Sequence, residues 1–352
     1  MDGGGVDSLN MPNLFLTGAT GYIGGTVLTR LLDHHLQRTF SITLLVRSFE
    51  KAALLNRTFG QKYNLRAIVG SNSDLELLRE LAANADVVFA CADADDLAAA
   101  KAILGGMRDR YSKTGVASTL IHTSGTGVLS DNANGMRSTS TIYSDLNISQ
   151  LETLSPDQPH RNVDLALVEA DSHGYVKTYI ILPSTIYGFA SGPLVEQGIQ
   201  NYRSQQIPTL VDVGLQRNQG GMVGQGKNQW GNVHIDDVAD LYIHIFDLSM
   251  KASAPPEFAH GRAGFYFAEN GEHRLYSVGE EISRVLSSMG KGSPTPTTFN
   301  DQETRLYFPD GTSLGSNSRC RAERGYKIGW RPSRKTQNML DSIQAEVEVS
   351  LP

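Results

Sequence analysis

The sequence predicts an α/β protein in which a doubly wound parallel sheet carries helices on both faces. Over the first half of the chain, short apolar segments rich in β-branched residues alternate with longer amphipathic or Ala-rich segments. Strands and helices that alternate in this way form a parallel sheet, because each parallel strand needs a crossover helix before the next. Glycine is enriched, at 35 of 352 residues, which suits the many loops of such a fold.

The strand and helix segments follow one another in a regular order. The expected strands cover residues 14–16, 40–46, 65–69, 86–92, 119–123 and 178–182. The expected helices cover residues 22–35, 50–59, 94–111 and 163–172, with a further helix that begins at residue 74. In that further helix, Leu75, Leu78 and Leu81 make one apolar face. Ligands of open parallel sheets bind beyond the carboxyl ends of the strands, so each strand end is a candidate wall of the site.

A glycine motif joins the first expected strand to the first helix. Gly18, Gly21 and Gly24 have the spacing Gly-x-x-Gly-x-x-Gly. Such a turn leaves backbone N–H groups pointing one way at the positive end of the helix dipole, where a phosphate binds. Glycine tolerates positive φ and lets a pyrophosphate approach the backbone. The alternative is an ordinary strand-to-helix turn. The cofactor contacts expected here are Gly18, Thr20, Gly21, Tyr22, Ile23 and Gly24.

The ends of the later strands indicate which cofactor binds. Arg47 ends the second strand, where NAD-binding folds carry an acidic residue and an arginine pairs with the 2′-phosphate of NADP. NADP(H) is therefore preferred over NAD(H), unless Arg47 points only to solvent. We expect Ser71 and Asn72 near the adenine, and Cys91 and Ala92 near the other half of the cofactor. The Cys91 side chain reads as a small buried apolar group rather than a reactive thiol.

The second half of the chain departs from this rhythm. Residues 127–159 are polar and turn-rich, too long for an ordinary connection. The elements expected after the sixth strand are a helix at 193–204, short strands near 220–226 and 230–234, a helix at 236–248, a strand at 264–268 and a helix at 277–289. The strand at 264–268 is expected to return to the sheet. We therefore predict a Rossmann-type dinucleotide-binding domain at 12–190 and an interwoven C-terminal substrate lobe at 191–352.

Composition excludes several other classes of function. A net charge of −6 argues against nucleic-acid binding, which usually needs a basic face. Two cysteines, Cys91 and Cys320, make neither a metal cluster nor a disulfide framework, and no metal is expected. We see no secretory signal, and no apolar run approaches the ~20 residues needed to span a bilayer. The expected location is cytoplasmic.

The chain resembles the extended short-chain dehydrogenase/reductase superfamily, in particular its epimerase/dehydratase and NmrA-like branches. The matching motifs lie at residues 17–24, 45–48, 86–89, 122–124, 183–188, 233–239, 317–321 and 326–332. The resemblance implies a nicotinamide-dinucleotide fold, frequently dimeric, that acts on sugars, ketones, alcohols or enones. It also makes Pro183 and Thr185 candidate cofactor contacts and Tyr187 a candidate substrate contact. Met222 and His234 are candidate substrate contacts because they lie in the expected cap.

Proton transfer in this superfamily usually rests on a Ser or Thr after the fifth strand and on a Tyr-x-x-x-Lys pair, whose lysine stabilises the phenolate. Ser124 matches the first position, but no tyrosine of this chain has a lysine four residues later. One alternative is His160 as proton donor, oriented by Asp164, although His160 also fits a plain surface residue. Another is a phenol supplied by Tyr143 or Tyr187.

These observations predict an NADP(H)-dependent oxidoreductase acting on a carbonyl, alcohol or enone of a small metabolite, with Ser124, His160 and Tyr143 as the catalytic candidates. The missing tyrosine–lysine pair leaves two alternatives. One is a non-catalytic NADP(H)-sensing regulator of NmrA-like type, and the other is an epimerase, isomerase or dehydratase that uses tightly bound NAD(P). The only partners expected are the small-molecule substrate and a second copy of the chain.

Overall fold

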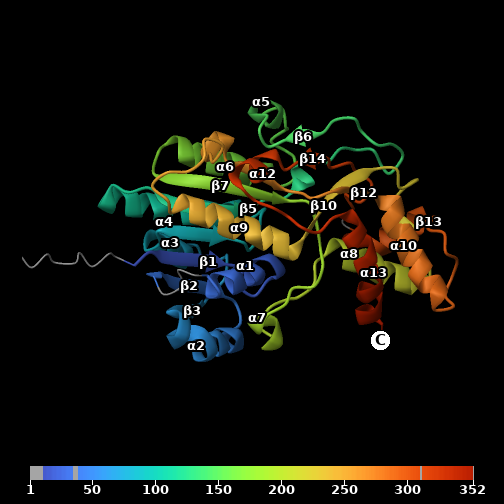
Figure 1. The fold of residues 1–352 in the computed structure, drawn as a ribbon, viewed down its shortest axis with the longest axis horizontal. Coiled ribbons are helices and arrows are strands. Elements are labelled where there is room, and N and C mark those ends of the chain that lie inside the picture. Colours follow the sequence, from blue (N-terminus) through green and yellow to red (C-terminus); the bar gives the residue numbers. More distant parts are fainter. Residues whose placement is uncertain (1–10, 35–38, 310, 352) are drawn as a thin grey trace, which may run out of the picture.

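A computed structural model describes residues 11–34, 39–309 and 311–351. Its main feature is a parallel sheet of seven strands, in agreement with the predicted fold class (Figure 1). In spatial order these strands are β11 (Phe265–Ala268), β7 (Val176–Pro183), β5 (Ser118–Thr123), β4 (Val87–Ala90), β1 (Asn13–Thr17), β2 (Ser41–Val46) and β3 (Leu65–Val69). The order reverses at β1, so the carboxyl ends of β1 and β4 flank the crevice in which such sheets bind ligands.

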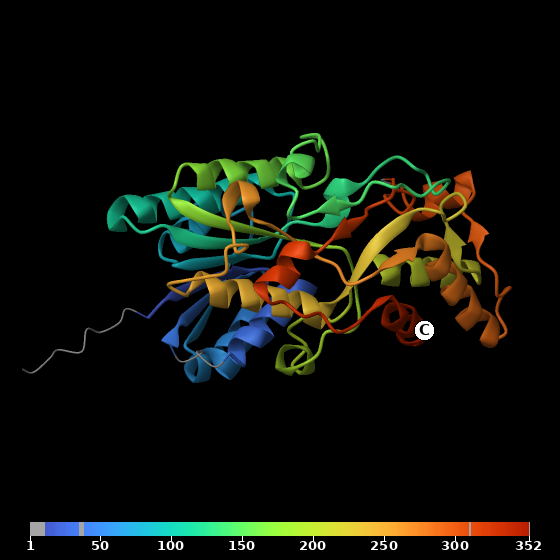
Figure 2. The same ribbon diagram turned by 45° about the horizontal axis from the view of Figure 1, so that its top comes forward.

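Helices cover both faces of the sheet (Figure 2). On one face α1 (Tyr22–Leu32) packs against α9 (Ile235–Ser249). The other face carries α3 (Leu75–Ala83), α4 (Leu97–Thr114) and α6 (Arg161–Ser172). A further helix, α2 (Phe49–Tyr63), packs along β2 and β3. Within the described residues, every helix is too short or too polar to cross a bilayer.

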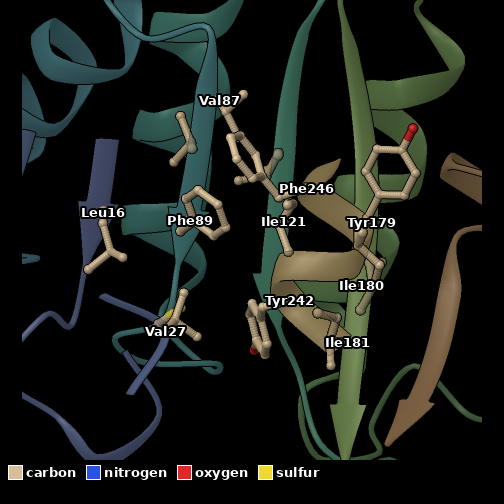
Figure 3. Close-up of a cluster of buried hydrophobic side chains, with 14 of the residues drawn as sticks. Leu16, Val27, Val87, Phe89, Ile121, Tyr179, Ile180, Ile181, Tyr242 and Phe246 are labelled. Carbon is tan, nitrogen blue, oxygen red and sulfur yellow. The ribbon is translucent and has the colours of Figure 1, made fainter. Parts of the chain in front are cut away.

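The central strands are buried because both of their faces are covered. All six residues of β5 are buried, and Phe89 of β4 and Ile121 of β5 are fully buried. Figure 3 shows these side chains beside Tyr242 and Phe246 of α9. A buried Phe, Ile or Leu contributes about 1.5–3 kcal/mol through removal from water, so this cluster is the main source of stability for the sheet.

The C-terminal part of the chain builds a second lobe and also returns to the sheet. The lobe core lies among α8 (Gln206–Arg217), α10 (Leu275–Ser288) and α13 (Thr336–Ser350). A small sheet joins β8 (Thr185–Tyr187), β10 (Gln229–His234) and β12 (Glu272–Arg274), and β9 (Gly221–Met222) pairs with β13 (Thr297–Thr298). The strand predicted at 264–268 is β11, which pairs in parallel with β7. The domain boundaries themselves stay a prediction.

The polar segment 127–159 contains short elements that the sequence did not indicate. They are η2 (Thr126–Leu129), β6 (Tyr143–Ser144) and α5 (Ile148–Leu151). The strand β6 pairs with β14 (Cys320–Arg321), so the loop is held by the C-terminal region.

The helix expected at 193–204 is wrong. The segment forms only α7 (Pro193–Glu196), because Gly198 adopts a left-handed conformation with φ +66° that ends the turn. The next helix, α8, starts at Gln206 and carries Pro208 in its first turn. Proline is tolerated there because the N–H groups of the first turn make no hydrogen bond within the helix. The helix expected to residue 35 ends earlier, at Leu32, and residue 35 itself lies outside the described part of the chain.

Three C-terminal helices have no counterpart in the sequence prediction. They are α11 (Asp301–Tyr307), α12 (Glu323–Ile328) and α13. The last of these packs on α8 and α10 and completes the lobe core with Met339, Ile343 and Val347. Further small elements are the 3-10 turn η3 (Gly261–Ala263) before β11 and the bridge between Trp230 and Ser318.

Candidate active site

The glycine motif forms a tight turn between β1 and α1. Gly18 has φ +76°, and a Cβ there would come within 2.6 Å of the Cys91 carbonyl oxygen at the end of β4. A Cβ on Gly24 would overlap the Gly18 carbonyl group. These two positions therefore accept only glycine, because the chain passes against itself and against β4. The result is a helix that starts directly beside the crevice.

The first turn of α1 has the features of a phosphate site. Its N-cap, Gly21, has no side chain to cap the helix, and no acidic residue lies in the first turn. The Gly21 N–H is used locally, at 2.9 Å from the Gly18 carbonyl. Within the described residues, no hydrogen bond is assigned to the N–H groups of Tyr22, Ile23 and Gly24. Three open N–H groups at a helix start, with no side chain above them, fit the pyrophosphate of a dinucleotide.

The other predicted cofactor residues lie at neighbouring strand ends. Arg47 follows β2 and is exposed, and Ser71 and Asn72 follow β3 in a turn where Asp74 accepts the Ser71 N–H at 2.7 Å. Ala92 is exposed beyond β4. Cys91 is buried, and burial raises its thiol pKa to about 12, which agrees with an apolar packing role. These residues share one edge of the sheet, but their contact with a cofactor stays a prediction.

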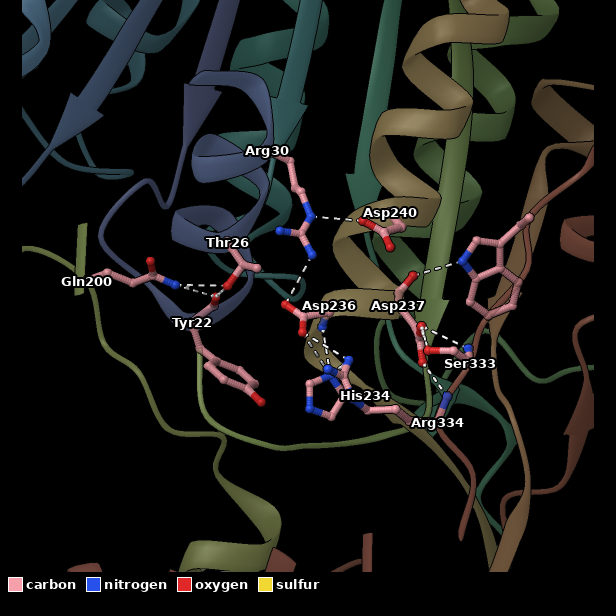
Figure 4. A network of polar contacts seen from close by, with 11 residues as sticks. Tyr22, Thr26, Arg30, Gln200, His234, Asp236, Asp237, Asp240, Ser333 and Arg334 are labelled. Carbon is pink, nitrogen blue, oxygen red and sulfur yellow. Dashed lines mark hydrogen bonds and ion pairs between the residues drawn. The ribbon is translucent and has the colours of Figure 1, made fainter. Parts of the chain in front are cut away.

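Tyr22 joins the start of α1 to the C-terminal lobe, because Gln200 Nε2 donates to the Tyr22 backbone carbonyl at 3.1 Å (Figure 4). Its hydroxyl donates to the Gly188 carbonyl at 2.5 Å, and burial raises the pKa of this phenol well above its usual value. On the neighbouring element Asp236 lies between Arg30 of α1, at 3.2 Å, and Arg334 of the C-terminal segment, at 3.0 Å. The helix α1, whose N-terminus would bind the phosphates, is therefore held to the lobe by these contacts. Because the Tyr22 hydroxyl is occupied, the predicted cofactor contact of Tyr22 would be made by its backbone N–H.

Ser124 lies at the carboxyl end of β5 and faces α6. Its backbone N–H continues the ladder with β7, at 2.8 Å from the Ile181 carbonyl. Its hydroxyl donates to Asp164 Oδ2 at 3.2 Å, and both residues are buried. Burial raises the pKa of Asp164 from 3.8 to about 7, and the Ser124 hydrogen bond only partly opposes this rise. Asp164 can therefore hold or release a proton near neutral pH.

His160 lies at the N-terminus of α6 and contacts Asp95 instead of Asp164. One carboxylate oxygen of Asp95 accepts both the His160 backbone N–H, at 3.0 Å, and ring atom Nδ1, at 2.8 Å. An ionised carboxylate oxygen can only accept a hydrogen bond, so His160 Nδ1 carries the proton in this contact. Nε2 is then the ring nitrogen that can contact another group. A Cβ on Gly125 or Gly127 would lie 3.1–3.2 Å from Nε2, so this nitrogen faces the loop just after Ser124.

One sequence expectation about this cluster is wrong. Asp164 does not orient His160, because His160 has φ +66° and lies outside the helical spiral, so the spacing of four residues does not bring the two side chains together. Asp95, which no motif indicated, takes that role from the loop after β4. Only its acidic surroundings in the sequence, residues 93–96, hinted at it.

Tyr143 lies in β6 with its ring packed against the main hydrophobic core. Within the described residues, no hydrogen bond is assigned to its hydroxyl, and none joins it to Ser124 or His160. Pro183 ends β7, and Thr185 of β8 donates its hydroxyl to Gln206 Oε1 at 2.7 Å. A catalytic role for Tyr143 and cofactor contacts for the other two stay predictions.

The residues predicted to contact a substrate are distributed through the lobe. Tyr187 is buried, its hydroxyl donates to the Lys335 carbonyl at 3.0 Å, and its ring lies edge-on to His234. His234 ends β10 and is the N-cap of α9, where its Nδ1 accepts the Asp236 N–H at 3.1 Å. Met222 lies in the separate pair β9–β13. The Tyr187 hydroxyl is therefore occupied, and substrate contact by these residues stays a prediction.

Comparison with known proteins agrees with this geometry. A family model described as NAD(P)H-binding matches residues 18–144. The protein named oxidase ucsJ, from Acremonium sp, is 32% identical over 91% of this chain and 92% of its own length. An uncharacterized protein from Schizosaccharomyces pombe is 24% identical over 92% of this chain and 96% of its own length. The chain belongs to the same family as oxidase ucsJ, and its residues 18–144 belong to the NAD(P)H-binding family.

Solved structures of low sequence identity share the fold over almost the whole chain. The dTDP-glucose 4,6-dehydratase from Bacillus anthracis in complex with NAD has a TM-score of 0.64 at 17% identity, covering 96% of this chain and 97% of its own. Yeast methylglyoxal/isovaleraldehyde reductase Gre2 complexed with NADPH has a TM-score of 0.60 at 13% identity, covering 96% of this chain and 99% of its own. At such identities the likeness concerns the fold alone.

Compared with the short-chain dehydrogenase/reductase superfamily that the sequence resembles, this chain differs at the proton-transfer pair. The usual tyrosine and lysine would fall at Pro156 and His160, or at His160 and Asp164, near the start of α6. In the second case an imidazole and a carboxyl group stand in these places. The hydrogen bonds to Ser124 and Asp95 show that both side chains are built into a polar cluster at the sheet edge.

Asp164 is expected to make the protein less stable as pH rises. The folded chain holds the Asp164 proton up to about pH 7, whereas the unfolded chain releases it near its ordinary pKa of 3.8. Between these values the unfolded state binds fewer protons, so the free energy of unfolding falls, by at most about 4 kcal/mol. Asp164→Asn removes this fall. In urea denaturation the free energy of unfolding of the variant, relative to that of the wild type, should rise from about pH 4 to about pH 7.

The same measurement on Asp157→Asn, an exposed acid before α6, should follow the wild type. Asp145, with a pKa raised to about 7 by burial, and His122, with a pKa lowered to about 4 by burial, are present in every variant. Their contributions cancel in the difference. If the free energies of unfolding of the wild type and of Asp164→Asn differ by the same amount at every pH, Asp164 is ionised in the folded state.

Proposed function

We propose that this protein is an NADP(H)-dependent oxidoreductase that moves a hydride to or from a carbon–heteroatom or activated carbon–carbon bond of a small metabolite. One observation carries the proposal: the Ser124–Asp164 and His160–Asp95 pairs share the carboxyl edge of the sheet with an uncapped, glycine-lined helix start. The name of the relative ucsJ, an oxidase, supports the reaction class. Carbonyls, alcohols and enones are the reference substrates.

The residues of this chain divide the work as follows. The bound nicotinamide supplies or accepts the hydride. The open N–H groups of α1 would hold its pyrophosphate. Ser124 Oγ would bind the reacting heteroatom, and its contact with Asp164 would carry a proton to or from that hydroxyl. His160, with Nδ1 held by Asp95, would present Nε2 as a second proton acceptor or donor. Tyr143 remains the second candidate for that role.

The NADP preference rests on Arg47, and its removal gives a direct test. Arg47→Ala should weaken NADPH binding about tenfold or more and leave NADH binding almost unchanged, because only NADPH has a 2′-phosphate for the guanidinium. Fluorescence titration with both cofactors measures this. Arg66→Ala, on the neighbouring strand β3 and also exposed, is the matched control. Equal losses for NADPH and NADH would remove Arg47 from the phosphate site.

The function is tested by titration with NADPH and NADH, followed by carbonyl, alcohol and enone substrates monitored at the nicotinamide absorbance. Turnover of a carbonyl with NADPH oxidation, lost in Ser124→Ala, supports the proposal. Substrate conversion without net NADPH oxidation favours the epimerase or dehydratase alternative. Tight cofactor binding with no conversion of any substrate favours an NADP(H)-sensing regulator. A folded protein that binds neither cofactor at millimolar concentration overturns the proposal.

A further inference from the structure

The ionisable side chain in contact with the Ser124 hydroxyl is an acid. Asp164 accepts its hydrogen bond, and a second acid, Asp95, holds the neighbouring His160. A cation, Arg161, lies beside Asp164 on α6. Its guanidinium contacts other groups, because Nη2 donates to the Leu151 carbonyl at 3.3 Å and the group lies over the Phe265 ring. The Ser124 hydroxyl therefore contacts a carboxyl group and no lysine of the usual Tyr-x-x-x-Lys pair.

Four buried polar atoms in and beside this cluster have no partner in the described structure: Asp164 Oδ1, His122 Nε2, Thr126 Oγ1 and Arg161 Nε. Asp164 is fully buried, and it is the one of the four whose side chain contacts the Ser124 hydroxyl. Buried polar atoms are normally satisfied, so an unpaired Oδ1 beside a proposed reacting site indicates that a bound group completes it. Since this atom is a carboxyl oxygen, a donor or cationic group fits.

We infer that the bond oxidised or reduced in this site joins carbon to nitrogen, so that the substrates are an imine and the corresponding amine. This inference rests on the proposed function and narrows its substrate class. Proton transfer through Ser124 leaves Asp164 ionised, and the neutral alcohol formed from a carbonyl offers this buried carboxylate no opposite charge. A protonated imine and a product ammonium are cations, and the same carboxylate stabilises both.

The reaction balances with the groups present. In the reducing direction the imine nitrogen takes a proton from Ser124 Oγ, which takes one from Asp164. The imine carbon takes up a hydride from the reduced nicotinamide, the π pair of the C=N bond becomes the lone pair of the amine, and the nicotinamide is oxidised by two electrons. Asp164 is left ionised beside the amine and regains a proton from solvent. The raised pKa of Asp164, about 7, suits both directions near neutral pH.

Binding of a small amine tests the inference without turnover. Pyrrolidine is a cation in neutral solution, and cyclopentanol is a neutral alcohol of similar size. We expect isothermal titration calorimetry with saturating NADP⁺ to give at least about tenfold tighter binding for pyrrolidine. Because the cation would ionise Asp164 on arrival, its binding should release a proton, seen as a heat that differs between phosphate and Tris buffers.

A pair of variants assigns this effect to Asp164. Asp164→Asn keeps the shape of the side chain and should retain NADPH binding, which checks that the variant is folded. It should lose the proton release and about tenfold or more of the pyrrolidine affinity. Asp157→Asn, an exposed acid just before α6, should behave like the wild type.

Turnover completes the test. With NADPH the cyclic imine pyrroline should be reduced at least about tenfold more efficiently than cyclopentanone. Equal or tighter binding of cyclopentanol, or an Asp164→Asn variant that binds pyrrolidine like the wild type, overturns the inference. A preference for cyclopentanone overturns it too and leaves the proposed function standing. Failure to bind either dinucleotide removes the proposed function as well.

Discussion

Gly24→Ala is expected to abolish dinucleotide binding at concentrations that saturate the wild type. The added Cβ would overlap the Gly18 carbonyl group, which is backbone and has nowhere to move because Gly18 is itself packed on Cys91. The start of α1 must then shift away from the loop, and its open N–H groups no longer converge. We expect at least about a hundredfold weaker NADPH binding and a loss of about 1–3 kcal/mol in unfolding free energy. Fluorescence titration and urea denaturation measure the two effects.

Two glycines of α4 provide the controls. Gly106→Ala would overlap the Arg79 carbonyl at the contact with α3, so it should lower stability and leave cofactor affinity unchanged. Gly105→Ala meets only ordinary contacts with the Arg79 side chain and should be neutral or slightly stabilising in a helix. Gly24→Ala with normal NADPH affinity would mean that the helix start does not hold the phosphates.

The central strands could be predicted closely because local and global signals agree there. The strand expected at 14–16 lies within β1, Asn13–Thr17, and the strand expected at 86–92 contains β4, Val87–Ala90. Both are short apolar runs in the middle of the sheet, and a parallel strand buried on both faces needs no other signal.

The C-terminal lobe was harder to predict from the sequence because its helices are stabilised by partners far along the chain. The apolar positions of α8 face α10 and α13, and α13 begins more than a hundred residues later. The helical signal around Gln206 is also masked by Pro208 and by the Gln-rich surroundings. Segments of this kind fold because of tertiary packing, which a single local window does not contain.

In the candidate site, too, some residues could be predicted from local sequence and others could not. Gly18, Gly24 and Ser124 were predictable because each depends on its own strand and turn. The partners of His160 and Ser124 were not, because Asp95 and Asp164 come from different elements and meet only after the sheet has formed. The helical spacing of His160 and Asp164 pointed to a wrong pair, since the left-handed conformation of His160 removes it from the helix.

His160→Ala is expected to lower kcat by about 10²–10⁴-fold with little effect on KM, if Nε2 exchanges a proton with the substrate. The Asp95 carboxylate holds the ring through Nδ1, and Gly125 and Gly127 leave room only for the bare edge that carries Nε2. Asp95→Asn should lower kcat by a smaller factor, about ten- to a hundredfold, because the ring keeps its place but loses its fixed tautomer. Steady-state kinetics with the substrate found by the screen measure both variants.

Added imidazole separates proton transfer from a structural role of His160. The ring that His160→Ala removes leaves a space beside Gly125 and Gly127 that free imidazole can enter, so millimolar imidazole should restore part of kcat in this variant and none in Ser124→Ala. His173→Ala, an exposed histidine at the other end of α6, should keep wild-type kinetics. A loss of kcat that imidazole does not relieve, together with a lowered unfolding free energy, would assign His160 to the support of the α6 terminus. The proton would then have to come from Ser124 and Asp164 alone, because these two side chains already share a buried hydrogen bond at the same edge of the sheet.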